Sequence, residues 1–128
     1  MTSYLWVALG GALGSMARFG LSGLAARTLG AGFPWGTLIV NVAGSLVIGV
    51  AAALMTADGR PLVAGDARSF VVVGVLGGFT TFSAFSLETF DLARNNGWVA
   101  AGTNVVASVA LCILAVALGY WVATTLQR

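Results

Sequence analysis

The stretch "GVLGGFTTFSAFSLE" (Gly74–Glu88) decides how the fold of this chain is read. It is apolar enough to lie in a membrane, yet a glycine pair is followed by threonines and serines between three phenylalanines. Gly77 and Gly78 permit unusual backbone angles, and irregular backbone is tolerated at membrane depth only inside protein or beside a polar cavity. One interpretation of the stretch is a membrane helix that breaks near its middle. The alternative is an intact helix in which the glycines allow close packing.

The composition around this stretch is that of a membrane protein. Of 128 residues, 59% are hydrophobic and 8% are charged, whereas soluble domains carry about 25% charged residues. Four runs of 16 to 33 residues contain no charge, and a bilayer core needs about 20 mostly apolar residues per helix. The sequence predicts an all-α membrane protein with one domain over residues 1–128. Its four spans are expected near 4–26, 35–56, 69–90 and 98–125.

Several other classes of protein are disfavoured. The first span lacks a basic flank and is too long for a signal peptide, and the single Cys112 allows no internal disulfide. Six scattered arginines form no nucleic-acid patch. There is no histidine and no embedded pair of acids, so an enzyme is not expected. Pro34 stands where it would begin the second helix.

The arginines leave the orientation of the chain weakly specified. Lysine and arginine imbalance normally fixes which loops face the cytoplasm. Here one side carries Arg60, Arg68 and Arg128, and the other carries Arg27, Arg94 and, if it reaches that surface, Arg18. Copies inserted both ways and paired head to tail are one reading, and a single orientation set by subtler cues is the other. Because a four-helix bundle has a filled centre, a polar path favours an oligomer.

Uncharged polar residues recur at helical spacing in three spans. The stripes are Thr37, Asn41 and Ser45, then Ser83 and Ser86 interleaved with Phe82 and Phe85, and then Asn104, Ser108 and Cys112. Residues three or four apart share a helix face. Single polar residues of this kind often bond neighbouring membrane helices, but three aligned stripes favour a lined pathway.

The chemistry of these stripes suits a small anion. They offer amide and hydroxyl donors with no carboxylate at mid-membrane, whereas proton-coupled exporters and cation pores need acids there. Glu88 and Arg18 lie toward the ends of their spans. The ring edges of Phe82 and Phe85 carry partial positive charge, although packing against lipid is their ordinary role. Backbone carbonyls freed by a break in "GGFTT" would instead suit a cation.

Three segments together resemble the CrcB/Fluc family of fluoride channels. They are "GGALGSMARFG" (Gly10–Gly20), "FPWGTLIVNVAGSLVIG" (Phe33–Gly49) and "GFTTFSAFSLET" (Gly78–Thr89). The resemblance covers essentially the whole chain. It implies an antiparallel, dual-topology homodimer of four-helix subunits, with the third helix broken at its middle and two pores between the subunits. It also implies passive export of cytoplasmic fluoride across the inner cell membrane, which would lower fluoride toxicity.

The resemblance also implies roles for particular residues. By motif position, the fluoride pathway would fall on Asn41, Phe82, Ser83, Phe85 and Ser108, and the vestibule on Arg18 and Glu88. Carbonyls of Gly77 and Thr80 from both copies would bind one structural sodium ion at the dimer axis. The chain departs from the family pattern at Ala84, Asn104 and Cys112, so its outer polar track is expected to differ in detail.

Two other functions remain as alternatives. A small dual-topology multidrug exporter would need a carboxylate in the middle of the first span, and none is present there. A membrane subunit that only binds partners would show no ion flux on its own.

Overall fold

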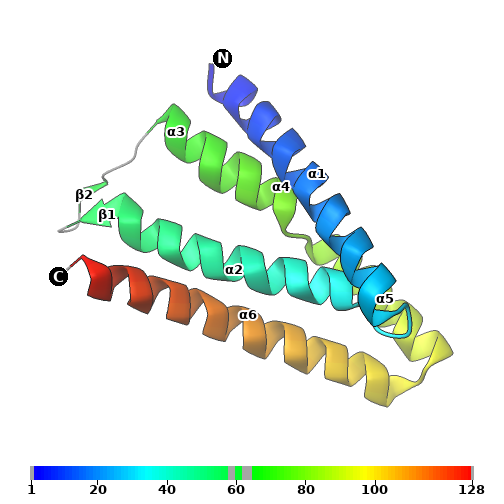
Figure 1. Cartoon of the computed structure of the whole chain (residues 1–128). Helices are drawn as coiled ribbons and strands as arrows, with labels where there is room; N and C mark the ends of the chain where they lie inside the picture. The colour runs from blue at the N-terminus through cyan, green and yellow to red at the C-terminus, as the bar shows by residue number, and fades with distance from the viewer. Residues whose placement is uncertain (1, 58–59, 62–64, 128) are drawn as a thin grey trace.

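The computed structural model describes residues 2–57, 60–61 and 65–127. Three long helices are α1 (Thr2–Leu29), α2 (Trp35–Met55) and α6 (Trp98–Leu126) (Figure 1). The third predicted span divides into α3 (Asp66–Arg68), the π-helix η1 (Ser69–Leu76), α4 (Gly77–Phe79) and α5 (Phe82–Asn95). The helices begin and end within five residues of the predicted spans.

The connections follow from local chemistry. Gly30 ends α1 with a φ of 85°, a conformation that glycine adopts without steric cost, and its N–H donates to the Ala26 carbonyl at 3.1 Å. Pro34 directly precedes α2, as predicted, and its carbonyl accepts from Leu38 at 3.1 Å. The sequence did not predict β1 (Thr56–Ala57) and β2 (Arg60–Pro61), a short antiparallel pair.

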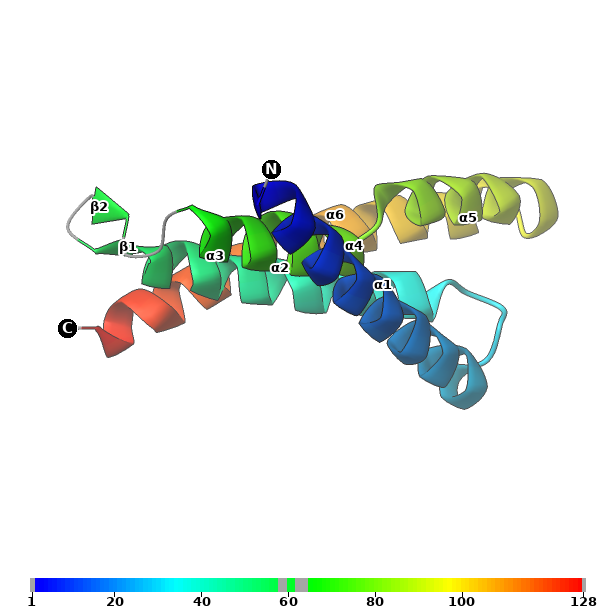
Figure 2. The ribbon, with the colours of Figure 1, turned by 90° about the horizontal axis from the view of Figure 1, so that it is seen from above.

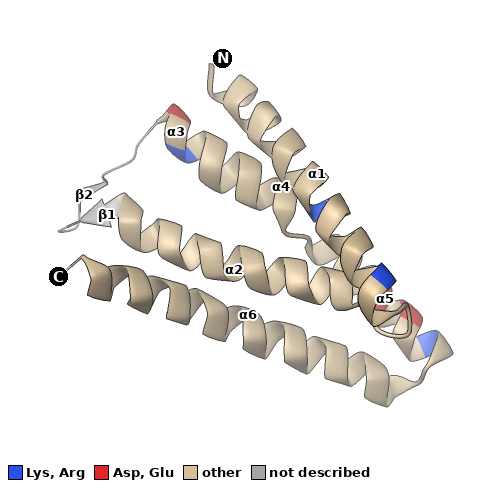
Figure 3. Cartoon of the chain, viewed as in Figure 1, with Lys and Arg blue, Asp and Glu red and all other residues tan. Residues whose placement is uncertain are grey.

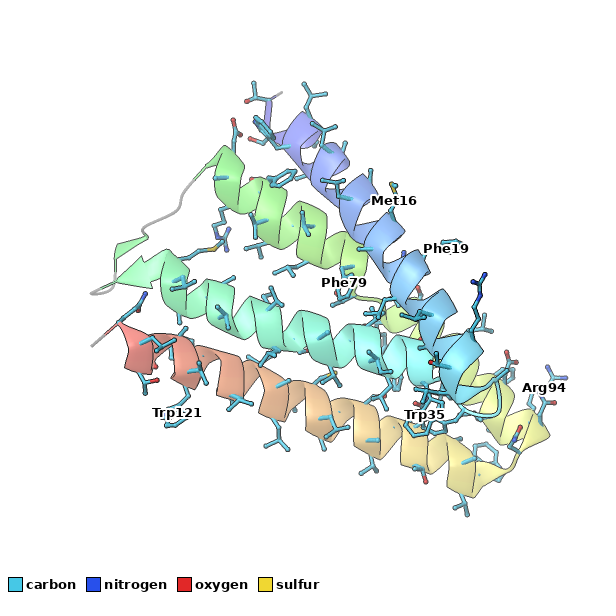
Figure 4. The ribbon with its side chains drawn as sticks, in the orientation of Figure 1. Met16, Phe19, Trp35, Phe79, Arg94 and Trp121 are labelled. Carbon is cyan, nitrogen blue, oxygen red and sulfur yellow. The ribbon has the colours of Figure 1, made fainter. Side chains whose placement is uncertain are left out.

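The described helices fit a protein that crosses a membrane. Three segments, Trp35–Met55, Asp66–Asn95 and Trp98–Leu126, are long and apolar enough to span a bilayer. The 28-residue α1 also has sufficient length, but it is not among these three. Large apolar side chains such as Trp121 lie on the outer surface, where a soluble protein would seldom expose so many (Figure 4). Charged residues lie on α1, α3 and α5, and α2 and α6 carry none (Figure 3).

Glycines allow two pairs of helices to pack closely. α2 lies along α6, where a side chain at Gly49 would collide with the Val116 carbonyl oxygen. α1 lies along η1, where a Cβ at Gly14 would collide with the Val75 carbonyl and lie 2.8 Å from the Phe79 nitrogen. Such small residues let membrane helices approach backbone to backbone. This packing fixes the first half of the third span before it breaks.

The third span breaks, as predicted, but not at the glycine pair. Gly77 keeps helical angles, with φ −64° and ψ −37°, and the chain becomes extended only at Thr80 (ψ 158°) and Thr81 (ψ 121°). A Cβ at Gly78 would lie 2.6 Å from the Gly11 carbonyl oxygen, so this glycine serves close packing. The expectation that the glycines form the break is therefore wrong. Polar side chains hold the break instead.

The break divides the molecule into two ends. Beyond it, α5 continues over the start of α6, and α1 diverges from α5 (Figure 2). The loop between α1 and α2 and the turn before α6 lie at this end, opposite the β1–β2 pair and the C-terminus (Figure 1). Arg128, one of the three arginines expected on the same side of the membrane, lies outside the described residues.

We expect Gly14→Val to destabilise the protein, because the new side chain must push α1 away from η1. Overpacking of this kind costs about 1–3 kcal/mol. Denaturant or thermal unfolding of the purified protein in detergent measures the loss. Gly20→Val is the matched control on the same helix, since a Cβ there meets nothing within 4 Å. Equal stability of the two variants would show that the close packing of α1 and η1 contributes little.

Candidate functional site

The amide side chain of Asn41 holds the break in the third span. Its Nδ2 donates to the Thr81 carbonyl at 2.9 Å, and its Oδ1 accepts from the Thr81 N–H at 2.8 Å. Both backbone groups of Thr81 are thereby satisfied by one residue of α2. An unpaired backbone group inside a membrane protein is costly, so this pairing allows the extended backbone to persist there.

The side chain of Thr81 begins the second half of the span. Thr81 is the N-cap of α5, and its Oγ1 accepts from the Ala84 N–H at 3.2 Å. Ser83 lies beside it, with 3.3 Å between the two hydroxyl oxygens. Threonine is a favoured N-cap because its hydroxyl replaces a missing carbonyl acceptor. Thr81 therefore fixes where α5 begins and, with it, the position of the phenylalanines in its first turn.

These side-chain bonds divert donors from two backbone carbonyls. In an unbroken helix, the Thr81 N–H would donate to the Gly77 carbonyl and the Ala84 N–H to the Thr80 carbonyl. Asn41 and the Thr81 hydroxyl take those donors instead. Thr80 remains tied to the first half of the span, since its N–H and Oγ1 both donate to the Leu76 carbonyl, at 3.0 and 2.9 Å. The break thus presents carbonyl oxygen atoms near its start.

A groove of about 490 Å³ runs beside the break. It is bounded by α2, the first half of the third span, α5 and α6. Six of the residues to which the family resemblance assigns a site role line it: Asn41, Gly77, Thr80, Phe82, Phe85 and Ser108. Ser45 and Cys112 line it too. The tertiary structure therefore gathers most of the predicted pathway residues around one opening.

The two phenylalanines at the start of α5 have different surroundings. Their ring centroids are 5.3 Å apart and the rings are tilted by 47°. Phe82 is 78% exposed, whereas Phe85 is 9% exposed. Phe79, before the break, points from α4 toward α2 (Figure 4), and a Cβ at Gly44 would lie 3.2 Å from its ring. Phe82 is thus the exposed ring of the groove lining, and Phe85 is the buried one.

A second cavity, of about 540 Å³, lies at the end where α1 and α5 diverge. Thr37 and Glu88 line it, and the Thr37 hydroxyl donates to Glu88 Oε1 at 2.8 Å. Glu88 Oε2 is buried and has no hydrogen-bond partner among the described residues. Because Thr37 lies one turn before Asn41, a single face of α2 joins this end cavity to the groove.

Other predicted site residues lie apart from these openings. Ser83 is exposed, and the described lining of the groove does not include it. The Ser86 hydroxyl donates to the Phe82 carbonyl at 2.9 Å. Arg18 is half-buried on α1, and the described residues that line the end cavity include its neighbour Phe19 but not Arg18.

Sequence reasoning missed the contribution of Thr81. A threonine three residues before Ala84, at the start of a new helix, is a recognisable N-cap signal, and the expectation of a break at the glycines left it out. The pairing of Asn41 with the Thr81 backbone had no sequence signal, since the residues are 40 positions apart. The hydrogen bond from Asn104 on α6 to Thr89 on α5 had no sequence signal either.

Comparison with known proteins identifies the family. Residues 5–120 match the family model described as CrcB-like protein, Camphor Resistance (CrcB). A protein of Opitutus terrae named fluoride-specific ion channel FluC is 57% identical over 99% of this chain and 96% of its own length. A protein of the same name from Paramagnetospirillum magneticum is 52% identical over 100% of both chains. Another from Methylocella silvestris is 48% identical over 98% of this chain and 95% of its own length. The chain belongs to the CrcB family.

We expect Asn41→Leu to loosen the break, because both backbone groups of Thr81 lose their partner. The loss of two hydrogen bonds, at about 1 kcal/mol net each and so about 2 kcal/mol together, corresponds to roughly thirtyfold faster amide exchange. Hydrogen–deuterium exchange of peptides covering Thr81 measures this rate. Ser45→Ala, one turn further along the same face, is the control and should leave exchange unchanged. Unaltered exchange in Asn41→Leu would mean that the break is held by other contacts.

Proposed function

We propose that this protein is a fluoride-specific ion channel that lets fluoride leave the cytoplasm passively. The 57% identity over 99% of the chain with a relative named for that activity carries the proposal. The site agrees in its chemistry, since the groove offers an amide, hydroxyls and phenylalanine rings and no carboxylate among its described lining residues. Membrane potential would drive the anion outward.

The described openings suggest the path of the ion. An anion would enter through the end cavity, whose described lining includes Glu88 and Asp91, and would pass along α2 to Asn41. The Thr37 hydroxyl gives its single proton to Glu88 Oε1 and so offers the anion no donor there. It then reaches the groove, where hydroxyl donors and the edges of Phe82 and Phe85 replace its water. Each contact is weak by itself, and conduction requires sites that release the ion as readily as they bind it.

Two alternatives are not favoured. A multidrug exporter coupled to protons would need an acid within α1, and the sequence of that helix contains none. A subunit without transport activity disagrees with the names of the relatives, which are those of ion channels. The same names make the family one of channels, not enzymes.

An antiparallel homodimer would complete the pathway. In a single subunit the groove is open to the surface, and Phe82 at its edge is 78% exposed. A second copy inserted in the opposite direction would cover it and create two symmetric paths. The near-even division of arginines between the two sides of the chain supports insertion in both directions. In such a dimer α1 serves as a fourth span in the inner cell membrane.

A structural sodium ion is proposed at the dimer axis, held by carbonyls of Gly77 and Thr80 from both copies. Both residues line the groove, and both carbonyls have lost their helical donors to side chains. Carbonyl oxygens suit a hard cation such as sodium. No group of three or more histidine, cysteine or acidic residues among the described ones offers another metal site. The ion would supply positive charge that binds the two breaks together.

Fluoride efflux from liposomes that contain only this chain tests the channel. We expect rapid release, detected by a fluoride electrode, without a proton gradient. Phe82→Ile should slow release by about tenfold, because ring contacts are worth about 0.5–1.5 kcal/mol. Phe90→Ile is the matched control, since Phe90 is an exposed ring on α5 outside the groove. Absence of release from the wild-type chain would reject the channel. Equal release by both variants would remove Phe82 from the path.

Removal of sodium tests the proposed cation. We expect replacement of sodium by N-methylglucamine on both membrane faces to abolish most efflux and to reduce the dimer fraction seen by chemical cross-linking. Both should recover when sodium is restored, because the ion acts by joining the two copies. Efflux and cross-linking that do not depend on sodium would contradict the assigned site, and a chain that remains monomeric in bilayers would contradict the dimer.

A further inference from the structure

A chain of hydrogen bonds links α6 to the start of α5 beside the groove. Asn104 Nδ2 donates to Thr89 Oγ1 at 2.8 Å, and that hydroxyl donates to the Phe85 carbonyl at 2.6 Å. On the other side of Asn104, the Ser108 hydroxyl donates to Oδ1 at 3.4 Å. Asn104 is only 1% exposed, so its amide has no access to water.

The direction of each hydrogen in this chain is fixed by the Phe85 carbonyl. A carbonyl only accepts, so Thr89 must give it the single hydroxyl proton. Thr89 Oγ1 then needs a donor, which requires Asn104 to present its NH2 group there. The amide oxygen of Asn104 consequently faces Ser108 and accepts its proton. The Phe85 carbonyl therefore determines the orientation of the buried Asn104 amide, and the amide oxygen determines that of the Ser108 hydroxyl.

The two ends of this chain are residues of the proposed pathway. Phe85 and Ser108 line the groove, whereas Asn104 and Thr89 are absent from its described lining. The bond from Ser108 to Asn104 is also long, since hydroxyl donors usually lie 2.5–3.0 Å from their acceptors. A weakly held hydroxyl proton can turn from Asn104 toward an anion in the groove.

From this geometry we propose that Asn104 is a positioning residue for fluoride conduction. Through the Thr89 hydroxyl it fixes the backbone of Phe85, and through its own oxygen it restrains the Ser108 hydroxyl until an anion arrives. This inference rests on the proposed channel function. It assigns a role to one of the positions at which the chain departs from the family pattern.

Fluoride and chloride efflux from liposomes, measured per folded channel, tests the role. We expect Thr89→Val and Asn104→Leu each to slow fluoride release by about five- to tenfold, the effect of roughly one lost hydrogen bond. Both should also raise chloride release relative to fluoride. Thr89→Ser keeps the hydroxyl and should behave as the wild type. The double variant should be no slower than the slower single variant, because both act through one chain of bonds.

The matched control is Thr103→Val. Thr103 is the exposed neighbour of Asn104, and among the described residues its hydroxyl bonds only to the Val99 carbonyl of its own helix, at 2.9 Å. It should retain wild-type fluoride release and selectivity. If Thr89→Val and Asn104→Leu lower only the amount or thermal stability of folded protein, with unchanged release per channel, Asn104 is structural and the inference is overturned. Failure of Thr89→Ser to restore release would overturn it as well, while fluoride release by the wild type keeps the channel function intact.

Discussion

The pairing between the Asn41 amide and the backbone of Thr81 is the interaction on which the rest of the site depends. A broken helix inside a membrane leaves N–H and C=O groups that water cannot reach. One amide side chain supplies both an acceptor and a donor and so satisfies both groups of the residue at the break. Because Thr81 is held in this way, its hydroxyl is free to cap α5 and thereby aim the phenylalanines.

The same pairing explains how a chain of so few charges can present polar chemistry at depth. Side chains that bond to the backbone at the break take the helical donors of the Gly77 and Thr80 carbonyls, which leaves oxygen acceptors there without any acidic residue. Neutral donors on α2 and α6 lie beside these carbonyls. Hydrogen-bond acceptors and donors thus lie around one groove, built from backbone and uncharged side chains among the described lining residues.

Close helix packing gives this arrangement its rigidity. The glycines of α1 and the third span bring two backbones together before the break, and those of α2 and α6 do the same on the other side. Asn41 therefore projects from a well-fixed helix toward a well-fixed partner. Of the glycine pair, Gly78 contributes to this packing, and two threonines and one asparagine maintain the break.

The sequence alone determined the membrane class, the four helical segments and the groups of residues that share a helix face, while the interruption of the third helix was expected from the family resemblance. Uncharged runs and helical periodicity depend only on neighbours along the chain, and the family motifs carried most of the site. Tertiary structure alone decided that the break falls at Thr80 and Thr81, and that Asn41 serves Thr81. It also turned Asn104 toward Thr89 while Ser108, on the same stripe, lines the groove. Periodicity fixes which residues share a face, but packing between helices distant in sequence fixes the rotation of that face and the partner it meets.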